Sequence, residues 1–168
     1  MTKNLFLFLF ISVVAVAGCK KKDNSCGFPV SNVIAPASEQ EALLDSLTAR
    51  GIDATLAPSG FYYKINEPGD GASPTSLCST LAVYYRGGFL NGTAFDSTTN
   101  DKPAVFQLGQ VIGGWKKGLP LIKKGGDITL YIPPSLGYGT KEVKDNNGNV
   151  LIPANSNLVF KVQLLDVQ

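Results

Sequence analysis

The stretch VIGGWKKGL, residues 111–119, is the one helix candidate in the chain from Gly60 onward, so the predicted architecture is built around it. It is short and contains the pair Gly113-Gly114 beside Trp115, the single tryptophan of the sequence. Each glycine weakens a helix by about 1 kcal/mol relative to alanine. We therefore expect this helix to be held in place by tertiary packing.

On both sides of this helix lie short runs rich in β-branched and aromatic residues, separated by Gly, Pro, Asn and Asp. Such runs are typical of strands joined by turns. The predicted strands are Phe61–Asn66, Ser79–Phe89, Ala104–Gln107, Asp127–Ile132 and Leu158–Asp166. They predict an α+β domain in which a mostly antiparallel sheet wraps over one short helix. Within residues 141–150, Asn147-Gly148 predicts a hairpin tip, which either overhangs a site or is a variable loop.

A second helix is predicted before this domain, over residues 39–50. Ser38 followed by Glu41 has the spacing of a capping box, and Gly51 is a natural helix stop. We expect this helix to lie outside the core domain, either packed on it or used as a spacer.

The N-terminus has the features of a secretory signal peptide over residues 1–18. Lys3 precedes an apolar run that is too short for a membrane-spanning helix, which needs about 20 residues. The exit, Val16-Ala17-Gly18-Cys19, resembles the lipobox of bacterial lipoproteins. This resemblance implies lipidation, palmitate included, at Cys19 and a chain anchored in the bacterial cell envelope, on the periplasmic side or at the outer-membrane surface. The alternative is an ordinary cleavable signal that happens to end in cysteine.

The predicted organisation is thus a signal peptide over 1–18, a tether with its helix over 19–59, and the main domain over 60–168. If Cys19 carries lipid, Cys26 and Cys78 are left, and two cysteines in an exported chain can form a disulfide. Two buried free thiols are the alternative.

Composition excludes several functions. The chain has no histidine and three cysteines, which removes His-dependent nucleophilic catalysis and leaves too few thiolates for a structural zinc site. No phosphate-binding glycine pattern follows a strand. A net charge of +2 gives no field that would attract nucleic acid. We therefore expect no metal, no cofactor and no nucleic-acid partner.

Several ordered segments together resemble the FKBP-type peptidyl-prolyl cis-trans isomerases. They are Tyr84-Tyr85-Arg86-Gly87-Gly88, Gly92-Thr93-Ala94-Phe95-Asp96-Ser97, Phe106-Gln107-Leu108-Gly109, Val111–Gly118, Ile132–Gly139, Leu151-Ile152-Pro153 and Leu158–Leu165. The resemblance implies a half-wrapped antiparallel sheet with an apolar pocket for a proline ring between sheet and helix.

The resemblance also implies roles for individual residues. Trp115 would be the pocket floor, and the walls would be Tyr85, Phe95, Phe106, Val111, Ile112 and Phe160. The Tyr138 hydroxyl and the Ile112 backbone N–H would each bind a substrate carbonyl, Asp96 would line the polar edge, and Leu151 and Ile152 would overhang the site. Ala104 replaces a phenylalanine that many members have, which predicts a wider pocket, and Arg86 is the one candidate ion-pair partner for Asp96.

The implied activity needs neither a nucleophile nor a metal. An apolar pocket disfavours the charge-separated planar amide more than the twisted transition state, so it can lower the rotational barrier by differential binding. The expected function is acceleration of rotation about X–Pro bonds in exported, proline-containing clients, by a monomer. The alternative is a proline-peptide-binding or chaperone module of the envelope with little turnover. Taken singly, each aromatic would pass as a core residue.

Overall fold

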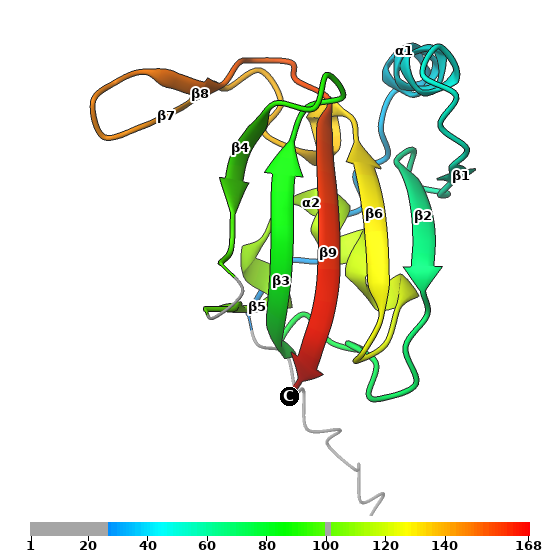
Figure 1. Ribbon diagram of the computed structural model, residues 1–168, viewed down its shortest axis with the longest axis vertical. Coiled ribbons are helices and arrows are strands. Elements are labelled where there is room, and N and C mark those ends of the chain that lie inside the picture. The colour runs from blue at the N-terminus through cyan, green and yellow to red at the C-terminus, as the bar shows by residue number, and fades with distance from the viewer. Residues whose placement is uncertain (1–26, 100–101) are drawn as a thin grey trace, which may run out of the picture.

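The computed structural model describes residues 27–99 and 102–168. Within these residues seven strands form one antiparallel sheet in the order β1-β2-β6-β9-β3-β4, with β5 paired to β3. The strands are β1 Thr55–Leu56, β2 Tyr62–Glu67, β3 Thr80–Gly88, β4 Ala94–Ser97, β5 Ala104–Gln107, β6 Asp127–Ile132 and β9 Leu158–Val167. Helix α2, Gly113–Gly118, lies behind the sheet in Figure 1, so the predicted α+β arrangement is confirmed.

Predicted and observed elements agree closely where the pattern is strong. β5 and β6 have the predicted bounds, and β2, β3 and β9 differ by one residue at their ends. Helix α2 ends at Gly118 because a 3₁₀ turn, Leu119–Leu121, with Pro120 inside it, takes over. Strand β4 was not predicted, because Asp96-Ser97 at its end has the composition of a turn.

The side chains of the two central strands alternate between the two faces of the sheet. On β9, Phe160, Val162 and Leu164 are buried toward α2, whereas Lys161 and Gln163 between them are exposed on the other face. Pairing of β9 with both β3 and β6 places Leu81, Val83, Ile128 and Leu130 in the same core. The face toward α2 is called the inner face below, and the opposite one the outer face.

Helix α2 approaches the sheet closely through two glycines one helical turn apart. A Cβ added to Gly114 would lie 2.5 Å from Ile132 Cδ1, and one added to Gly118 would lie 2.6 Å from Leu130 Cδ2. These residues of β6 are fully buried. The glycines that weaken the helix locally therefore permit the contact that holds it, as the sequence predicts.

Gly114→Ala is expected to lower the free energy of unfolding. Overpacking against Ile132 costs about 1–3 kcal/mol, which exceeds the gain of about 1 kcal/mol in helix propensity. Urea denaturation followed by circular dichroism measures the difference. Gly113→Ala is the matched control, because its added Cβ comes no closer than 3.3 Å to another residue. A Gly114→Ala variant as stable as wild type would contradict this account of the contact.

Helix α1, Ala37–Thr48, packs on the outer face. Leu43 and Leu47 are buried against Tyr62 of β2 and Tyr131 of β6, so this helix is packed on the domain and is no spacer. The predicted Ser38 cap is wrong: the helix begins at Ala37, and Pro36 occupies the N-cap position with a φ of −55°, close to the value that the proline ring fixes. Glu39 instead accepts a hydrogen bond from the Ser135 backbone N–H, at 3.0 Å.

The segment before α1 is also attached to the domain. Ala35 is buried in the main core and its N–H donates to the Ser59 carbonyl at 2.9 Å. Lys117 Nζ of α2 donates to the Ser31 carbonyl at 2.9 Å. Within the described ranges, no helix combines the length and apolarity needed to cross a membrane.

Cys78 is disulfide-bonded. Cys26, the partner predicted for it, lies outside the described residues, as do Cys19 and the predicted signal peptide. The pairing of Cys26 with Cys78 and the lipidation of Cys19 therefore stay predictions.

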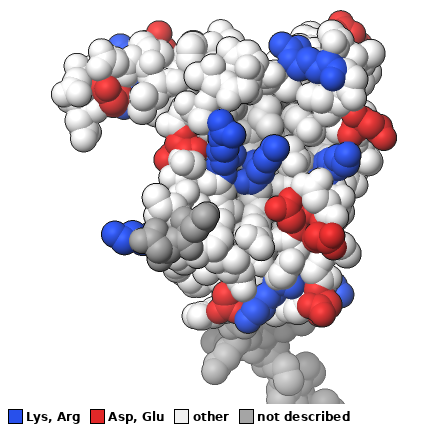
Figure 2. Space-filling model, viewed as in Figure 1, with Lys and Arg blue, Asp and Glu red and all other residues white. Residues whose placement is uncertain are grey.

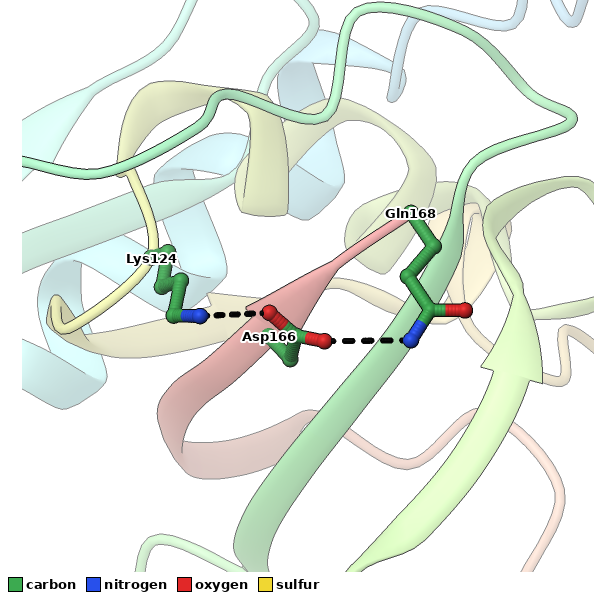
Figure 3. Close-up of polar contacts among 3 residues, drawn as sticks. All are labelled: Lys124, Asp166 and Gln168. Carbon is green, nitrogen blue, oxygen red and sulfur yellow. Dashed lines mark hydrogen bonds and ion pairs between the residues drawn. The ribbon is translucent and has the colours of Figure 1, made fainter.

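The end of β9 is tied to neighbouring segments by polar contacts (Figure 3). Lys124 Nζ lies 2.7 Å from Asp166 Oδ1, and the Gln168 side-chain amide donates to Asp166 Oδ2 at 3.2 Å. These hydrogen bonds hold the pKa of Asp166 below its usual value, and the one from Lys124 has the largest effect. The last residue also exchanges two backbone hydrogen bonds with Thr80, so the C-terminus closes the sheet against the start of β3.

Candidate active site

A cavity of about 320 Å³ opens on the inner face, between the sheet, α2 and the β4–β5 segment. Apolar and aromatic side chains form most of its wall, with a few polar groups at one edge. Its lining residues are Tyr85, Phe95, Asp96, Ala104, Phe106, Gln110, Val111, Ile112, Trp115, Tyr138 and Phe160. The arrangement is typical of small-ligand sites, which are concave, mostly apolar and oriented by a few polar groups.

Trp115 is the centre of this wall. It projects from α2 toward the sheet, is 5 % exposed, and contacts rings from three strands. Its ring centroid lies 5.1 Å from Phe160 and 5.3 Å from Tyr85, both nearly perpendicular, and 5.5 Å from Phe106. Edge-to-face contacts of this kind are favourable and fix ring orientation. The pocket is therefore preformed by packing.

Gly87 of β3 gives the pocket part of its shape. A Cβ at this position would lie 2.6 Å from Phe160 and 2.7 Å from Phe95. These two rings, 5.6 Å apart, meet over the glycine because no side chain separates them. A larger residue at position 87 would push the pocket walls apart.

The polar edge of the pocket is formed by two tyrosines and a carboxylate. The Tyr85 hydroxyl donates a hydrogen bond to Asp96 on β4. Burial, followed by this hydrogen bond, raises the pKa of Tyr85 well above its usual value. Burial and then the negative charge of Asp96 also raise the pKa of Tyr138. Both hydroxyls therefore stay protonated at neutral pH and can act as donors.

Tyr138 stands at the open side of the pocket, 39 % exposed. The chain turns sharply here: Gly139 has a φ of +62°, and its N–H donates to the Pro134 carbonyl at 2.8 Å. The Ile112 residue also lines the pocket, and its backbone N–H, which precedes the first turn of α2, donates to none of the backbone acceptors among the described residues. The lining thus offers two donors to the carbonyls of a bound chain, one hydroxyl and one amide.

Comparison with known proteins identifies the family to which the chain belongs. The sequence profile described as FKBP-type peptidyl-prolyl cis-trans isomerase matches residues 72–165, more than half of the chain. The chain belongs to this family. The matched region contains every residue that lines the cavity.

Individual relatives agree with this assignment. The chain is 42 % identical to FKBP-type peptidyl-prolyl cis-trans isomerase FkpA of Buchnera aphidicola, over 71 % of this chain and 44 % of that protein. It is 41 % identical to outer membrane protein MIP of Legionella longbeachae, over 67 % and 46 % respectively. The crystal structure of FkpA from Escherichia coli superposes with a TM-score of 0.64 at 39 % identity, covering 79 % of this chain and 58 % of that one. The chain spans less than half the length of these two curated relatives.

Among the residues that the FKBP resemblance implicates, two lie outside the cavity lining. Ile152 is 3 % exposed and belongs to the main core, whereas Leu151, its neighbour on β8 (Val150–Ile152), is 42 % exposed. β8 pairs with β7, Val143–Lys144, in a hairpin that projects from the sheet in Figure 1. Here strand alternation directs consecutive residues to opposite sides, so one of the pair is in the core.

Arg86 does not pair with Asp96. Tyr85 and Arg86 are consecutive on β3, so their side chains lie on opposite faces of the sheet. Asp96 bonds Tyr85 on the inner side, and no ion pair involving Arg86 occurs within residues 27–99 and 102–168. The expectation based on sequence proximity is therefore wrong.

Gln110 lines the pocket and was not predicted to do so. Its side-chain oxygen accepts a hydrogen bond from the Gln107 backbone N–H at 3.2 Å, which closes a 3₁₀ turn, Leu108–Gln110, before α2. Ala104 also lies in the lining. A glutamine beside a glycine carries no distinctive signal, which is why sequence reasoning missed it.

Proposed function

We propose that this chain accelerates cis-trans rotation about X–Pro peptide bonds in exported polypeptides. The observation that carries the proposal is the preformed, mostly aromatic pocket of about 320 Å³ with a few hydrogen-bond donors in its lining. A proline ring is apolar and its flanking carbonyls are not, so such a pocket matches both parts of an X–Pro unit. Membership of the FKBP-type family supports the same reaction.

The physical basis is the resonance of the amide bond. The barrier of about 18–20 kcal/mol reflects partial double-bond character, which places charge on the carbonyl oxygen. Water stabilises that charge in the planar ground state, and a pocket walled by Trp115, Phe106 and Phe160 does not. The twisted transition state loses much of the charge separation, so transfer into the pocket disfavours it less.

Each polar group has a proposed task in this reaction. The Tyr138 hydroxyl and the Ile112 N–H bind carbonyls flanking the proline, and thereby hold the chain on either side of the rotating bond. The Tyr85–Asp96 hydrogen bond keeps the Tyr85 ring against Trp115 and places a carboxylate at the pocket edge. No covalent step is involved.

A protease-coupled assay of a short Xaa-Pro peptide, with the purified full chain, tests the proposal. Uncatalysed exchange takes tens of seconds or longer, so added protein should shorten the slow phase in proportion to its concentration. Rates equal to the uncatalysed rate, with saturable binding of the same peptide, would favour a proline-peptide-binding module with little turnover.

Turnover is expected to be independent of pH from about pH 6 to about pH 9, since tyrosine ordinarily titrates near 10. The pKa of Tyr138 is raised above that value, so its hydroxyl keeps its proton throughout this range and loses it only at higher pH. No histidine is present to titrate in between. A pH profile of kcat/KM measures this, and a fall in rate between pH 7 and pH 9 would contradict the donor role.

The proposal includes attachment to a bacterial membrane through Cys19, supported by the lipobox resemblance of residues 16–19. Several acyl chains anchor stably where one gives only marginal binding. Cys19→Ala is expected to move the protein from the membrane to the soluble fraction of its native host. Intact-mass analysis of wild type should find a lipid mass on the mature chain, and an unmodified Cys19 would refute the idea.

A further inference from the structure

A second groove lies on the outer face of the sheet, away from the aromatic pocket. Its volume is about 290 Å³, and it is bounded by Ile52 after α1 and by the β3–β4 turn. The lining residues are Ile52, Arg86, Gly88, Phe89, Leu90, Gly92, Thr129, Tyr131, Val159 and Lys161. Arg86 follows Tyr85 on β3, and Lys161 follows Phe160 on β9. Consecutive strand residues point to opposite faces, so the groove and the aromatic pocket lie on opposite faces of these two strands.

One end of this outer groove carries unpaired positive charge. Arg86 on β3 and Lys161 on β9 are direct cross-strand neighbours. The same row continues across the sheet through Thr129 on β6 to Lys64 on β2. Like charges directly opposite each other destabilise a sheet. Among the described residues, neither Arg86 nor Lys161 forms an ion pair or a side-chain hydrogen bond. In Figure 2 blue Lys and Arg atoms lie side by side over the middle of β3 and β9, with further blue and red atoms scattered over the rest of this face.

The other end of the outer groove is apolar. Val159 and Leu90 are partly buried and pack on the cluster formed by α1 with Tyr131. The rim is held in place by Arg50, whose Nε donates to the Leu90 carbonyl at 3.1 Å while one Nη donates to the Ser46 carbonyl at 2.8 Å. The groove is therefore a shaped surface between α1 and the β3–β4 turn.

The spacing of the two ends matches an extended polypeptide. Val159 and Lys161 are two residues apart on β9, as are Gly88 and Arg86 on β3, a separation of about 7 Å. Residues i and i+2 of an extended peptide have the same spacing and point to the same side. An apolar side chain at i and a carboxylate at i+2 would thus reach Val159 and the two cations together. Because the groove is concave and the apolar part is inside it, a peptide fits better than a flat lipid surface.

We propose that the outer groove binds extended acidic segments of polypeptides, in which an apolar residue and an Asp or Glu lie two positions apart. Binding supplies the counter-charge that Arg86 and Lys161 lack. It is independent of proline, so the chain would hold a client at a second place, on the opposite face from the pocket.

Fluorescence anisotropy with the full chain tests the proposal, using a short labelled peptide that contains Leu-Ser-Glu and no proline. We expect saturable binding that weakens with added salt, and roughly two- to tenfold weaker binding of the Leu-Ser-Gln peptide, because ion pairs at exposed sites contribute only modestly to binding. Arg86→Gln/Lys161→Gln should abolish the preference for Glu over Gln. The double variant should fold normally by circular dichroism, because it removes a like-charge pair.

Lys123→Gln/Lys141→Gln is the control, because it removes the same charge from exposed sites outside the outer groove. This control should bind the Glu peptide as wild type does. Equal binding by the Arg86/Lys161 variant would overturn the proposal. So would binding of phosphatidylglycerol vesicles that depends on Arg86 and Lys161 with no binding of the peptide, because the groove would then serve a membrane surface.

Discussion

Trp115→Ala is expected to lower the free energy of unfolding by about 3–5 kcal/mol, the usual cost of truncating a large buried aromatic. Trp115 is 5 % exposed and touches Tyr85, Phe106 and Phe160, so its loss leaves a cavity where α2 meets the sheet. The affinity for proline peptides should also fall, because the side chain that forms the pocket floor is missing. Urea denaturation followed by circular dichroism measures the stability, and isothermal titration measures the binding.

Trp115→Phe separates the two effects. It keeps an aromatic floor and should retain more stability and more peptide binding than Trp115→Ala. Since Trp115 is the only tryptophan, wild-type fluorescence reports directly on the pocket and should change when a proline peptide binds. A Trp115→Ala protein of wild-type stability would show that the ring clusters described above contribute little to folding.

The second large effect is expected for Tyr138→Phe/Asp96→Asn. Both changes keep the shape of the side chain; Tyr138→Phe removes a hydroxyl and Asp96→Asn removes a negative charge from the pocket edge. At about 0.5–1.5 kcal/mol for each polar interaction lost, the pair should lose at most roughly 5- to 150-fold in kcat/KM. Tyr138 is 39 % exposed and the ring is kept, so stability should change little. The protease-coupled assay gives the rates.

Tyr63→Phe is the matched control for this pair. Tyr63 lies on β2, outside the pocket lining, so removal of its hydroxyl should leave turnover unchanged. The two single variants complete a double-mutant cycle, and because Asp96 acts electrostatically on Tyr138, their effects should not add. A well-folded double variant with wild-type turnover would show that the polar roles assigned to Tyr138 and Asp96 are wrong.

Much of the fold could be predicted because strand and helix patterns are local. The apolar alternation of Leu158–Asp166 and the β-branched run Asp127–Ile132 mark β9 and β6 within one residue. The glycines of residues 111–119 predicted a helix that needs tertiary packing to be stable. The close contact of Gly114 with Ile132 is such a packing contact. The family resemblance contributed the candidate pocket residues, most of which the structure brings together around one cavity.

Local patterns in the chain were enough to predict most of the strands, the short helix, the absence of histidine chemistry and the set of aromatics that could form a pocket. The face on which each side chain lies became known only from the folded structure. It placed Ile152 in the core, separated Arg86 from Asp96, replaced the Ser38 cap by Pro36, and set Arg86 opposite Lys161. The physical reason is that hydrophobic periodicity is a property of neighbouring residues, whereas register and pairing join residues that are far apart in the chain.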